Sequence, residues 1–300
     1  MHILIIGSEG FIGKNLVSFF NKKKHKVFRA DIFNISSENY FQINSDSVDF
    51  ASVFKEITYD LCINASGAAN VQLSLENPEL DYRLNVTNVF RILEAIRIFN
   101  PKCKFINFSS AAVYGNPTTL PVLESSPKNP ISPYGWHKLY SELVCKEYHS
   151  LYSLNTLSLR VFSAYGPGLR KQLFWDWYQK QKHQAEFEIF GTGNETRDFI
   201  YIDDLLQAVE LSFQYANFNG DSLNVANGEE VCIRDVADLF FGTLNYKGNF
   251  KFNNRIKNGD PVHWQADIGE VKKFGYKQSV SLDVGIRNYL DWLGEITVEH

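Results

Sequence analysis

The chain has 300 residues, of which 44% are hydrophobic and 21% are charged, and its formal net charge is −4. This length makes either one large α/β domain or a nucleotide-binding domain with a smaller companion, and the apolar share is ample for a large core. The negative balance argues against nucleic acid as a partner, because nucleic-acid binding needs a concentrated basic face. The short basic run Lys22–Lys24 follows an apolar helical pattern and predicts a solvated helix end.

Short β-rich runs alternate with amphipathic segments over the first half of the chain. The runs that predict strands are His2–Ile6, Lys26–Asp31, Tyr59–Ala65, Cys103–Ser109 and Thr156–Phe162. The segments that predict helices are Phe11–Phe20, Glu79–Phe99 and Tyr134–Tyr152. Apolar runs without alternation are typical of strands covered on both faces, and repeated βα units predict an α/β fold with a doubly wound parallel sheet.

The regular alternation of strand-like and helix-like segments ends after Phe162. The later segments are a turn at Tyr165–Gly168, a Trp-rich stretch at Trp175 and Trp177, a strand-like run at Phe187–Phe190, a loop-rich region at Asn245–Trp264 and a helical pattern at Leu282–Trp292. We expect residues 1–162 to form a nucleotide-binding domain and residues 163–300 to form mainly a smaller substrate-binding domain, with parts of 198–226 returning to the first. The smaller domain should cover the carboxyl ends of the strands, where such folds bind ligands.

The four cysteines show no CxxC spacing, and no His cluster lies near them in the sequence. Reduced thiols in a cytoplasmic protein fit this pattern better than a metal site or a disulfide framework. The chain begins with a strand-like run rather than a signal-peptide pattern, and no apolar stretch is long enough to span a bilayer. We therefore expect a soluble, cytoplasmic protein without metal or membrane partners.

Three glycines, Gly7, Gly10 and Gly13, stand where the first predicted strand meets the first predicted helix. Glycine permits positive φ and lets the backbone approach a pyrophosphate, and the free N–H groups of the helix start, at Phe11 and Ile12, favour phosphate there. A structural turn is the weaker alternative. This arrangement predicts a dinucleotide site.

Asp31 ends the second predicted strand, about twenty residues beyond the glycines, where a carboxylate can accept hydrogen bonds from ribose hydroxyls. The same charge would repel a 2′-phosphate, so NAD is favoured over NADP. Arg29 is a nearby cation that could partly offset this preference.

A catalytic set is predicted from Ser110, Tyr134 and Lys138. Tyr134 and Lys138 are four residues apart and project from one face of a helix that Pro133 is expected to begin. A lysine cation beside a phenol, assisted by the positive nicotinamide, favours the phenolate and lowers the phenol's pKa. Ser110 follows a predicted strand at its carboxyl end and can hydrogen-bond the reacting oxygen. A solvated helix face and turn-forming serines are the alternatives.

The glycine spacing, Gly-x-x-Gly-x-x-Gly, resembles that of the extended short-chain dehydrogenases/reductases. With the other motifs, the chain is similar to their NAD-dependent nucleotide-sugar epimerase/dehydratase branch, and resembles UDP-glucose 4-epimerase-like enzymes. The matching segments are Gly7–Gly13, Asp31, Asn85–Val86, Ser109–Gly115, Tyr134 with Lys138, Arg160–Gly168, Gly191–Asp204 and Gly259–Asp260. The resemblance implies a Rossmann domain with a smaller C-terminal substrate-binding domain.

The resemblance also implies further cofactor contacts. The positions that match them are Ser66, Gly67, Ala68, Asn85 and Ser109, together with Tyr134 and Lys138. For the segment Asn64–Ala68, a buried turn that needs small residues is an equal alternative.

The resemblance narrows the reaction to hydride transfer, usually at sugar C4, with the tyrosine taking the hydroxyl proton. Dehydratases and decarboxylases of the family carry an acid directly after the catalytic serine or threonine, where this chain has Ala111 and Ala112. Alanine exchanges no proton, so these reactions are disfavoured. A 4-epimerase and an NAD(P)H-dependent 4-keto-6-deoxy nucleotide-sugar reductase remain, and Asp31 favours the epimerase. A non-catalytic NAD-binding sensor or scaffold is the rival of another class.

The segment Gly191–Phe199 resembles the part of the family that contacts the substrate's diphosphate. In this segment, the resemblance assigns the phosphate clamp to Arg197, because a guanidinium offers forked donors to phosphate oxygens. The alternative is a surface ion pair of Arg197 with Asp198 or Asp203.

Several other residues are candidates for contacts with the substrate. Arg255 or Lys257 could complete the phosphate clamp, and Ser163 stands where relatives usually carry asparagine, so one substrate contact is altered. Trp175 and Trp177 could stack on the nucleotide base or belong to the core. In relatives, the helices matching Glu79–Phe99 and Tyr134–Tyr152 form a four-helix bundle, which implies a homodimer.

Overall fold

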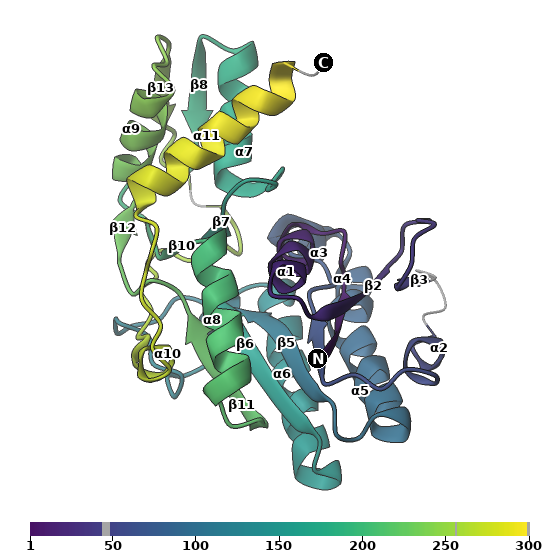
Figure 1. The fold of residues 1–300 in the computed structure, drawn as a ribbon. Coiled ribbons are helices and arrows are strands. Elements are labelled where there is room, and N and C mark those ends of the chain that lie inside the picture. The colour runs from purple at the N-terminus through teal and green to yellow at the C-terminus, as the bar shows by residue number, and fades with distance from the viewer. Residues whose placement is uncertain (44–48, 256, 299–300) are drawn as a thin grey trace.

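A computed structural model describes residues 1–43, 49–255 and 257–298. Its centre is a seven-stranded sheet with the order β11-β6-β5-β4-β1-β2-β3, and every neighbouring pair is parallel (Figure 1). The strands are β1 (His2–Ile6), β2 (Lys26–Asp31), β3 (Tyr40–Gln42), β4 (Leu61–Asn64), β5 (Lys104–Ser110), β6 (Asn155–Val161) and β11 (Asn219–Val225). The predicted doubly wound parallel sheet is confirmed.

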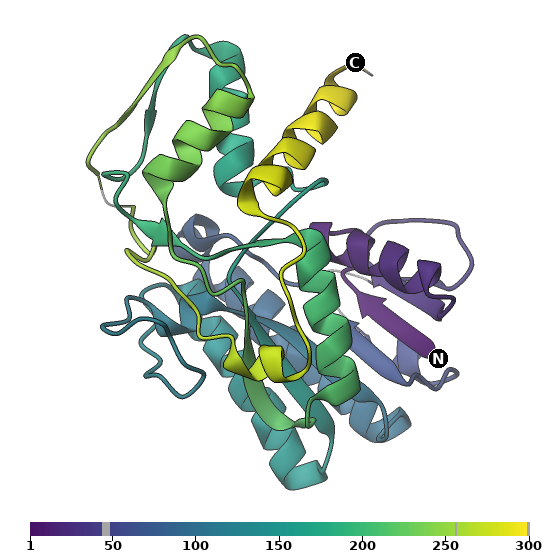
Figure 2. The same ribbon diagram turned by 60° about the vertical axis from the view of Figure 1, so that its left-hand side comes forward.

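Helices cover both faces of this sheet (Figures 1 and 2). Ile3 and Ile5 of β1 belong to the same core cluster as side chains of α1 (Phe11–Lys22) and α8 (Ile202–Tyr215). Leu4 and Ile6 belong to a second cluster, with side chains of α5 (Asn88–Phe99) and α6 (Pro133–Tyr152). Successive residues of one strand are therefore buried on opposite faces, which explains its continuous apolar sequence.

The predicted helical segment Glu79–Phe99 is interrupted by an irregular turn. It consists of α4 (Pro78–Tyr82), a five-residue π-helix η1 (Arg83–Thr87) and then α5. Single π turns occur frequently at functional sites, because they redirect side chains from the regular helical pattern. Two short helices, α2 (Ala51–Phe54) and α3 (Val71–Glu76), precede this segment.

The chain after β6 adds smaller pairings. β7 (Ser163–Tyr165) pairs with β10 (Phe199–Tyr201), β8 (Glu186–Ile189) with β13 (Asn249–Phe252), and β9 (Thr196–Arg197) with β12 (Val231–Cys232). The remaining helical elements are η2 (Ala111–Tyr114), α7 (Gln172–His183), α9 (Ile233–Thr243), α10 (Gly269–Lys273) and α11 (Leu282–Val298). α7, α9, α11, β8 and β13 gather at one end of the molecule, whereas β11 returns to the central sheet (Figure 1). The domain boundary at residue 162 stays a prediction.

Aromatic side chains form the core of that end. Trp177 is 1% exposed, and its ring lies 5.9 Å from that of Phe174 and 5.7 Å from that of Phe240, measured between centroids. Trp177 is therefore a core residue rather than a platform for a nucleotide base. Trp175 packs against the same core with part of its ring exposed.

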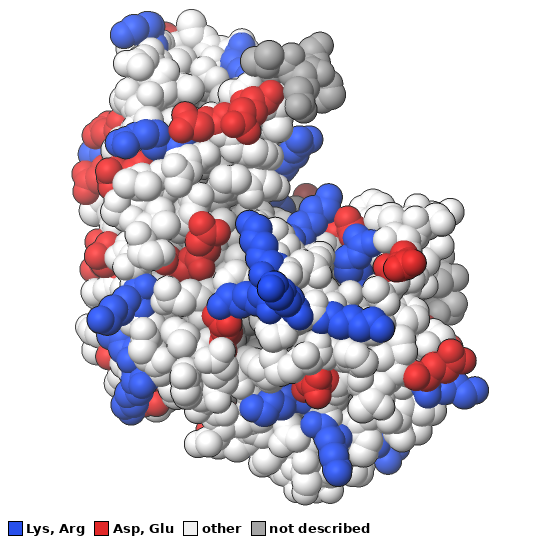
Figure 3. All heavy atoms as spheres, in the orientation of Figure 1, with Lys and Arg blue, Asp and Glu red and all other residues white. Residues whose placement is uncertain are grey.

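Surface charges of both signs are mixed on the face shown in Figure 3. The basic run predicted as a helix end lies where α1 stops at Lys22. Lys23 follows and forms an ion pair with Glu210 of α8, at 2.6 Å. Within the described part of the chain, no helix combines the length and the apolar character that a membrane crossing requires.

Candidate active site

The glycine turn between β1 and α1 has the tight geometry that its sequence predicts. Gly7 has φ +79°, and a Cβ atom there would lie 2.6 Å from the backbone nitrogen of Ser66. A Cβ atom at Gly13 would collide with the carbonyl oxygen of Gly7. Gly10 is the N-cap of α1, and its position supplies no side-chain hydrogen bond to the helix. The first N–H groups of the helix are therefore left for a ligand, and an anion is favoured there.

Asp31 lies at the end of β2, directly beside this turn. Its Oδ2 accepts a hydrogen bond from the backbone N–H of Glu9 at 2.8 Å, and its Oδ1 accepts one from Ile32 at 2.7 Å. Arg29 is directed elsewhere: its Nη1 lies 3.5 Å from Oε1 of Glu9, and its Nη2 donates to Ser37 Oγ at 2.8 Å. Among the ion pairs of the described residues, none joins Arg29 to Asp31. Arg29 therefore does not pair with the Asp31 carboxylate, as the predicted preference for NAD requires.

Asn85 lies in the π turn η1, and both polar atoms of its buried side chain lack a hydrogen-bond partner among the described residues. Gly67, after β4, approaches it so closely that a Cβ atom there would lie 2.5 Å from Asn85 Oδ1. Leaving a buried amide unpaired costs about 1–3 kcal/mol, so such a group marks a place where a ligand completes the contacts. The glycine turn, the uncapped helix and this amide together fit a dinucleotide.

The other residues predicted to contact the cofactor differ in their hydrogen bonds and burial. The Ser66 hydroxyl donates to Oδ1 of Asn64 at 2.5 Å, while Ala68 is half-buried. The Ser109 hydroxyl donates to Oε1 of Glu142 at 2.5 Å, so this side chain is already engaged within the protein. Their cofactor contacts stay predictions.

The structure brings Ser110, Tyr134 and Lys138 together. α6 begins at Pro133, as expected, and Ser132 caps it by accepting a hydrogen bond from Gly135 at 3.2 Å. Ser110 ends β5, its hydroxyl oxygen accepts a hydrogen bond from Ala112 N at 3.2 Å, and its side chain acts on Tyr134 by lowering the pKa of the phenol. Lys138 Nζ donates to the carbonyl of Phe108 at 2.9 Å and lies 5.8 Å from the centroid of the Tyr134 ring.

Burial shifts the pKa values of both titratable residues of this set. Burial raises the pKa of Tyr134 to about 12; the hydrogen bond from Ser110 opposes this shift, and the negative charge of Asp81 adds to it. Burial lowers the pKa of Lys138 to about 8; Asp81 and Glu142 oppose that shift, and Lys171 adds to it. In the protein without cofactor, burial therefore dominates the pKa of Tyr134, and Lys138 is not among the groups that shift it. The expected lowering of this pKa by Lys138 together with the nicotinamide stays a prediction.

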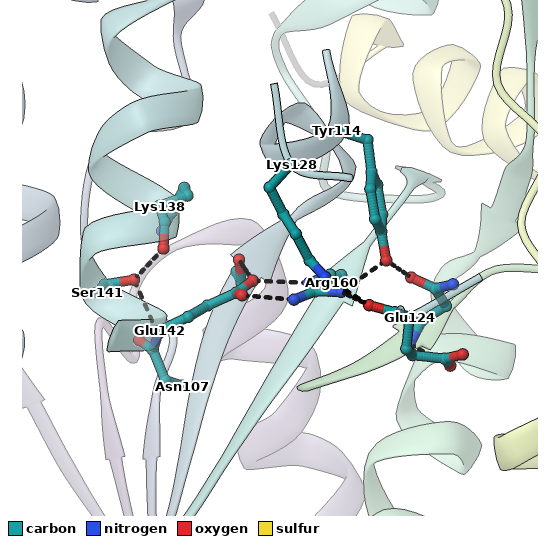
Figure 4. Close-up of polar contacts among 10 residues, drawn as sticks. Asn107, Tyr114, Glu124, Lys128, Lys138, Ser141, Glu142 and Arg160 are labelled. Carbon is teal, nitrogen blue, oxygen red and sulfur yellow. Dashed lines mark hydrogen bonds and ion pairs between the residues drawn. The ribbon is translucent and has the colours of Figure 1, made fainter. Parts of the chain in front are cut away.

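A buried polar network fixes the strands and the helix that carry these residues (Figure 4). The Glu142 carboxylate pairs with Arg160 of β6 at 2.7 and 2.9 Å, and both side chains are nearly inaccessible to solvent. Arg160 also donates to the Tyr114 hydroxyl at 2.7 Å. On the other side, Ser141 donates to the Lys138 carbonyl at 2.7 Å and accepts from Asn107 at 3.0 Å. These contacts hold β5, β6 and α6 in register around the catalytic set.

The structure shows the contacts of Arg197, the residue predicted to bind the diphosphate. Arg197 on β9 donates to the carbonyls of Thr196 and Val262, at 2.8 and 3.4 Å, and its guanidinium lies 5.5 Å from the centroid of the Trp264 ring. Within the described ranges, no ion pair joins Arg197 to a carboxylate, so the surface-pair alternative is not what the structure has. Buried Asp198 instead accepts hydrogen bonds from the backbone, at Ala266 and Gly228.

Among the described residues, no hydrogen bond or ion pair joins Arg197 to Ser163, Arg255 or Lys257. Ser163 lies on β7, where its N–H donates to the Asp198 carbonyl at 2.9 Å. The Arg255 carbonyl accepts from Gly191 N at 3.0 Å, and its side chain is exposed, as is that of Lys257. Their roles toward substrate stay predictions.

Residues 3–226 match the model of the NAD dependent epimerase/dehydratase family. The chain belongs to this family. It is 28% identical to a putative UDP-glucose 4-epimerase of Methanocaldococcus jannaschii, over 97% of this chain and 98% of that protein. It is 26% identical to the UDP-glucuronate 4-epimerase of Thermodesulfobacterium geofontis, over 98% of this chain and 96% of that protein.

Solved structures confirm the fold of this family member. The UDP-glucuronic acid 4-epimerase of Bacillus cereus, in complex with UDP-glucuronic acid and NAD, superposes with a TM-score of 0.89 at 24% identity, over 99% of this chain and 100% of that one. A UDP-glucose 4-epimerase of Thermotoga maritima gives the same score at 23% identity, over 99% of this chain and 100% of that one. Membership in the epimerase/dehydratase family confirms that the chain is an NAD-dependent enzyme.

The sequence motifs of this family member did not reveal every residue of the site. Glu142 stands four residues after Lys138, so the extended spacing Tyr-x-x-x-Lys-x-x-x-Glu on one helical face was a usable signal. Arg160 lay in a recognised segment, but its pairing with Glu142 across the sheet is set by the fold. No motif or spacing in the sequence indicated that Asp81 belongs to the site.

Proposed function

We propose that the chain is an NAD-dependent nucleotide-sugar 4-epimerase. The observation that carries the proposal is the meeting of Ser110, Tyr134 and Lys138 at the carboxyl end of β5, in a chain of the NAD dependent epimerase/dehydratase family. The relatives that extend over nearly its whole length include a putative UDP-glucose 4-epimerase and a UDP-glucuronate 4-epimerase. A UDP-hexose or a UDP-hexuronate is the substrate we propose.

The protein's own residues have distinct tasks in this reaction. Tyr134, as the phenolate, accepts the proton of the sugar C4 hydroxyl, and Ser110 donates a hydrogen bond to the same oxygen. Lys138, as a cation, favours the phenolate. The glycine turn and Asp31 would hold NAD, which would supply the acceptor and donor of the hydride at C4. Tyr134 gives its proton back once the keto sugar has turned over in the pocket, so that C4 is inverted and no atom is lost.

The residues around this set favour epimerisation over the other reactions of the family. Ala111 and Ala112 follow Ser110 in η2, and neither supplies a proton for dehydration or decarboxylation. Asp31, with no ion pair to Arg29, disfavours the 2′-phosphate of NADPH, which a reductase drawing on an external reduced pool would commonly use. Arg197 supplies the cation for the diphosphate.

The proposal includes a homodimer in the cytoplasm. Its support is an exposed apolar strip on α5 and α6, the helices expected to form the interface. The strip contains Phe90, Ile98, Trp136, Tyr140, Leu143, Leu151 and Tyr152. Exposed apolar residues gathered on two helices that pack against each other favour a protein partner, and the association of two copies through these helices would cover them.

The experiment that tests the function begins with the cofactor. The purified protein is denatured and the released nucleotide is identified by mass, and the native protein is then incubated with UDP-glucose, UDP-glucuronate and dTDP-glucose while NMR follows inversion at C4. We expect bound NAD and inversion of a UDP-sugar without net consumption of NAD.

The control for this experiment is Tyr134→Phe, which should retain NAD and lose inversion by at least about a hundredfold, the scale of one general acid–base group. Reduction of a 4-keto-6-deoxy nucleotide sugar by NADPH, with no inversion of any sugar offered, would replace the epimerase by the reductase.

A further inference from the structure

A buried carboxylate lies behind the catalytic set. Asp81 of α4 is 1% exposed, and its Oδ2 lies 2.6 Å from Nδ1 of His137 on α6. Its other oxygen, Oδ1, has no hydrogen-bond partner among the described residues. Taking a carboxylate out of water costs several kcal/mol, and one hydrogen-bonded partner offsets that cost only in part. A half-satisfied acid at this depth needs a reason beyond packing.

The position of His137 links this acid to the reaction. His137 directly precedes Lys138 and follows Tyr134 by three residues, so all three side chains belong to the first two turns of α6. The Tyr82 ring of α4 lies across the His137 ring, with centroids 5.2 Å apart and planes at 89°. The imidazole is thus held between the acid and an aromatic ring, in one orientation.

The charge of Asp81 reaches both catalytic side chains. It adds to the effect of burial in raising the pKa of Tyr134, and it opposes the effect of burial on the pKa of Lys138. The other groups that act on Tyr134 and Lys138 are Ser110 at the end of β5, Glu142 on α6 and Lys171 before α7. Asp81 is the one carboxylate in this set that acts on both members of the pair.

We infer that Asp81 and His137 are positioning residues, a buried acid–imidazole pair that aligns the first turns of α6 and sets the electrostatic potential at Tyr134 and Lys138. The inference rests on the proposed function, in which Tyr134 carries the proton. Asp81 favours the Lys138 cation, while the N–H dipole of His137, directed at Asp81 Oδ2, offsets part of the negative charge that would oppose the Tyr134 phenolate. The pair thereby sets the pH at which the phenolate forms.

The test measures Tyr134 directly, so that it does not depend on finding the substrate. NAD-bound protein is titrated with base while ultraviolet absorbance follows tyrosinate, and each protein is compared with the same protein carrying Tyr134→Phe. The difference between the two curves isolates Tyr134 from the other tyrosines. The variants are Asp81→Asn, which keeps an oxygen for the His137 N–H, and His137→Asn, which keeps a donor for Asp81.

The two variants should move the Tyr134 titration in opposite directions. Asp81→Asn removes a negative charge, so tyrosinate should form at lower pH, by roughly one unit, as a unit charge gives across a partly desolvated region. His137→Asn replaces the imidazole N–H, whose dipole offsets part of the carboxylate's charge, by a shorter amide that reaches Asp81 less closely, so tyrosinate should form at higher pH. Asp60→Asn is the matched control, because Asp60 accepts from His2 N at the amino end of the sheet, and it should move nothing.

The outcomes separate this inference from the proposed function. Unchanged titrations in both variants, with lower stability alone, would show a helix clamp without an electrostatic role and overturn the inference. Shifts in the same direction would also overturn it. If wild-type protein inverts no nucleotide sugar while the opposite shifts are found, the reaction assigned above fails and the pair stands. If Asp81→Asn does not fold, the direction in which His137→Asn shifts the Tyr134 titration decides whether the inference stands.

Discussion

At the scale of single residues, we propose that Asp31 decides which dinucleotide is bound. Its carboxylate stands at the end of β2 without an ion pair to Arg29, which is held by Glu9 and Ser37. Asp31→Asn should keep the hydrogen bond from Glu9 N through the amide oxygen but remove the repulsion of a 2′-phosphate. We expect the ratio of NADP to NAD affinity to rise about tenfold, or ~1.4 kcal/mol. Calorimetric titration of both cofactors measures it, and an unchanged ratio would contradict the role of Asp31.

The placement of the proposed catalytic residues was predictable because their signals are local. The spacing of Tyr134 and Lys138 places them on one helical face, and Ser110 follows a strand, whatever the rest of the chain does. Their pKa values were not predictable, because these depend on burial by distant segments. Asp81 was missed for the same reason: its contact with His137 spans 56 positions of sequence.

At the scale of elements, strands covered on both faces were the easiest to predict. β1 and β2 have the predicted bounds: β1 is a continuous apolar run before a glycine turn, and β2 carries buried Val27, Phe28 and Ala30 before Asp31. β3 was missed, since its three residues, Tyr40–Gln42, carry no pattern. The π turn within Glu79–Phe99 was missed too, since one inserted residue barely changes helical periodicity, although it buries Asn85.

The two tryptophans of α7 give a matched pair for testing the core of the C-terminal part. Trp177 is 1% exposed and surrounded by aromatic rings, whereas Trp175 lies on the same helix with its ring partly exposed. Trp177→Ala should lower the free energy of unfolding by ~3–5 kcal/mol, because the cavity cannot collapse among rigid rings. Trp175→Ala should cost roughly 1 kcal/mol. Urea denaturation compares them, and equal losses would show that Trp177 is not central to this core.

At the scale of the whole molecule, the sequence predicted the central sheet better than the part that covers it. The sheet is built from βα units that repeat one pattern, so each unit supports the interpretation of the next. The later strands are two to four residues long and pair with partners far away, as β8 does with β13. These strands are too short for hydrophobic periodicity to reveal them. Which of them pair depends on the assembled fold.

The proposed homodimer is a property of the whole molecule. Its interface can be tested by introducing a charged side chain into the apolar strip. Leu143 of α6 is 53% exposed within the apolar strip, and Tyr215 of α8 is 60% exposed on the opposite face of the sheet. Leu143→Glu would bury a carboxylate in each half of a two-fold interface, at a cost that doubles by symmetry, so light scattering should give the mass of one chain. Tyr215→Glu should leave the mass of two chains. A wild-type protein with the mass of one chain would refute the dimer, and a dimer unaffected by Leu143→Glu would place the interface elsewhere.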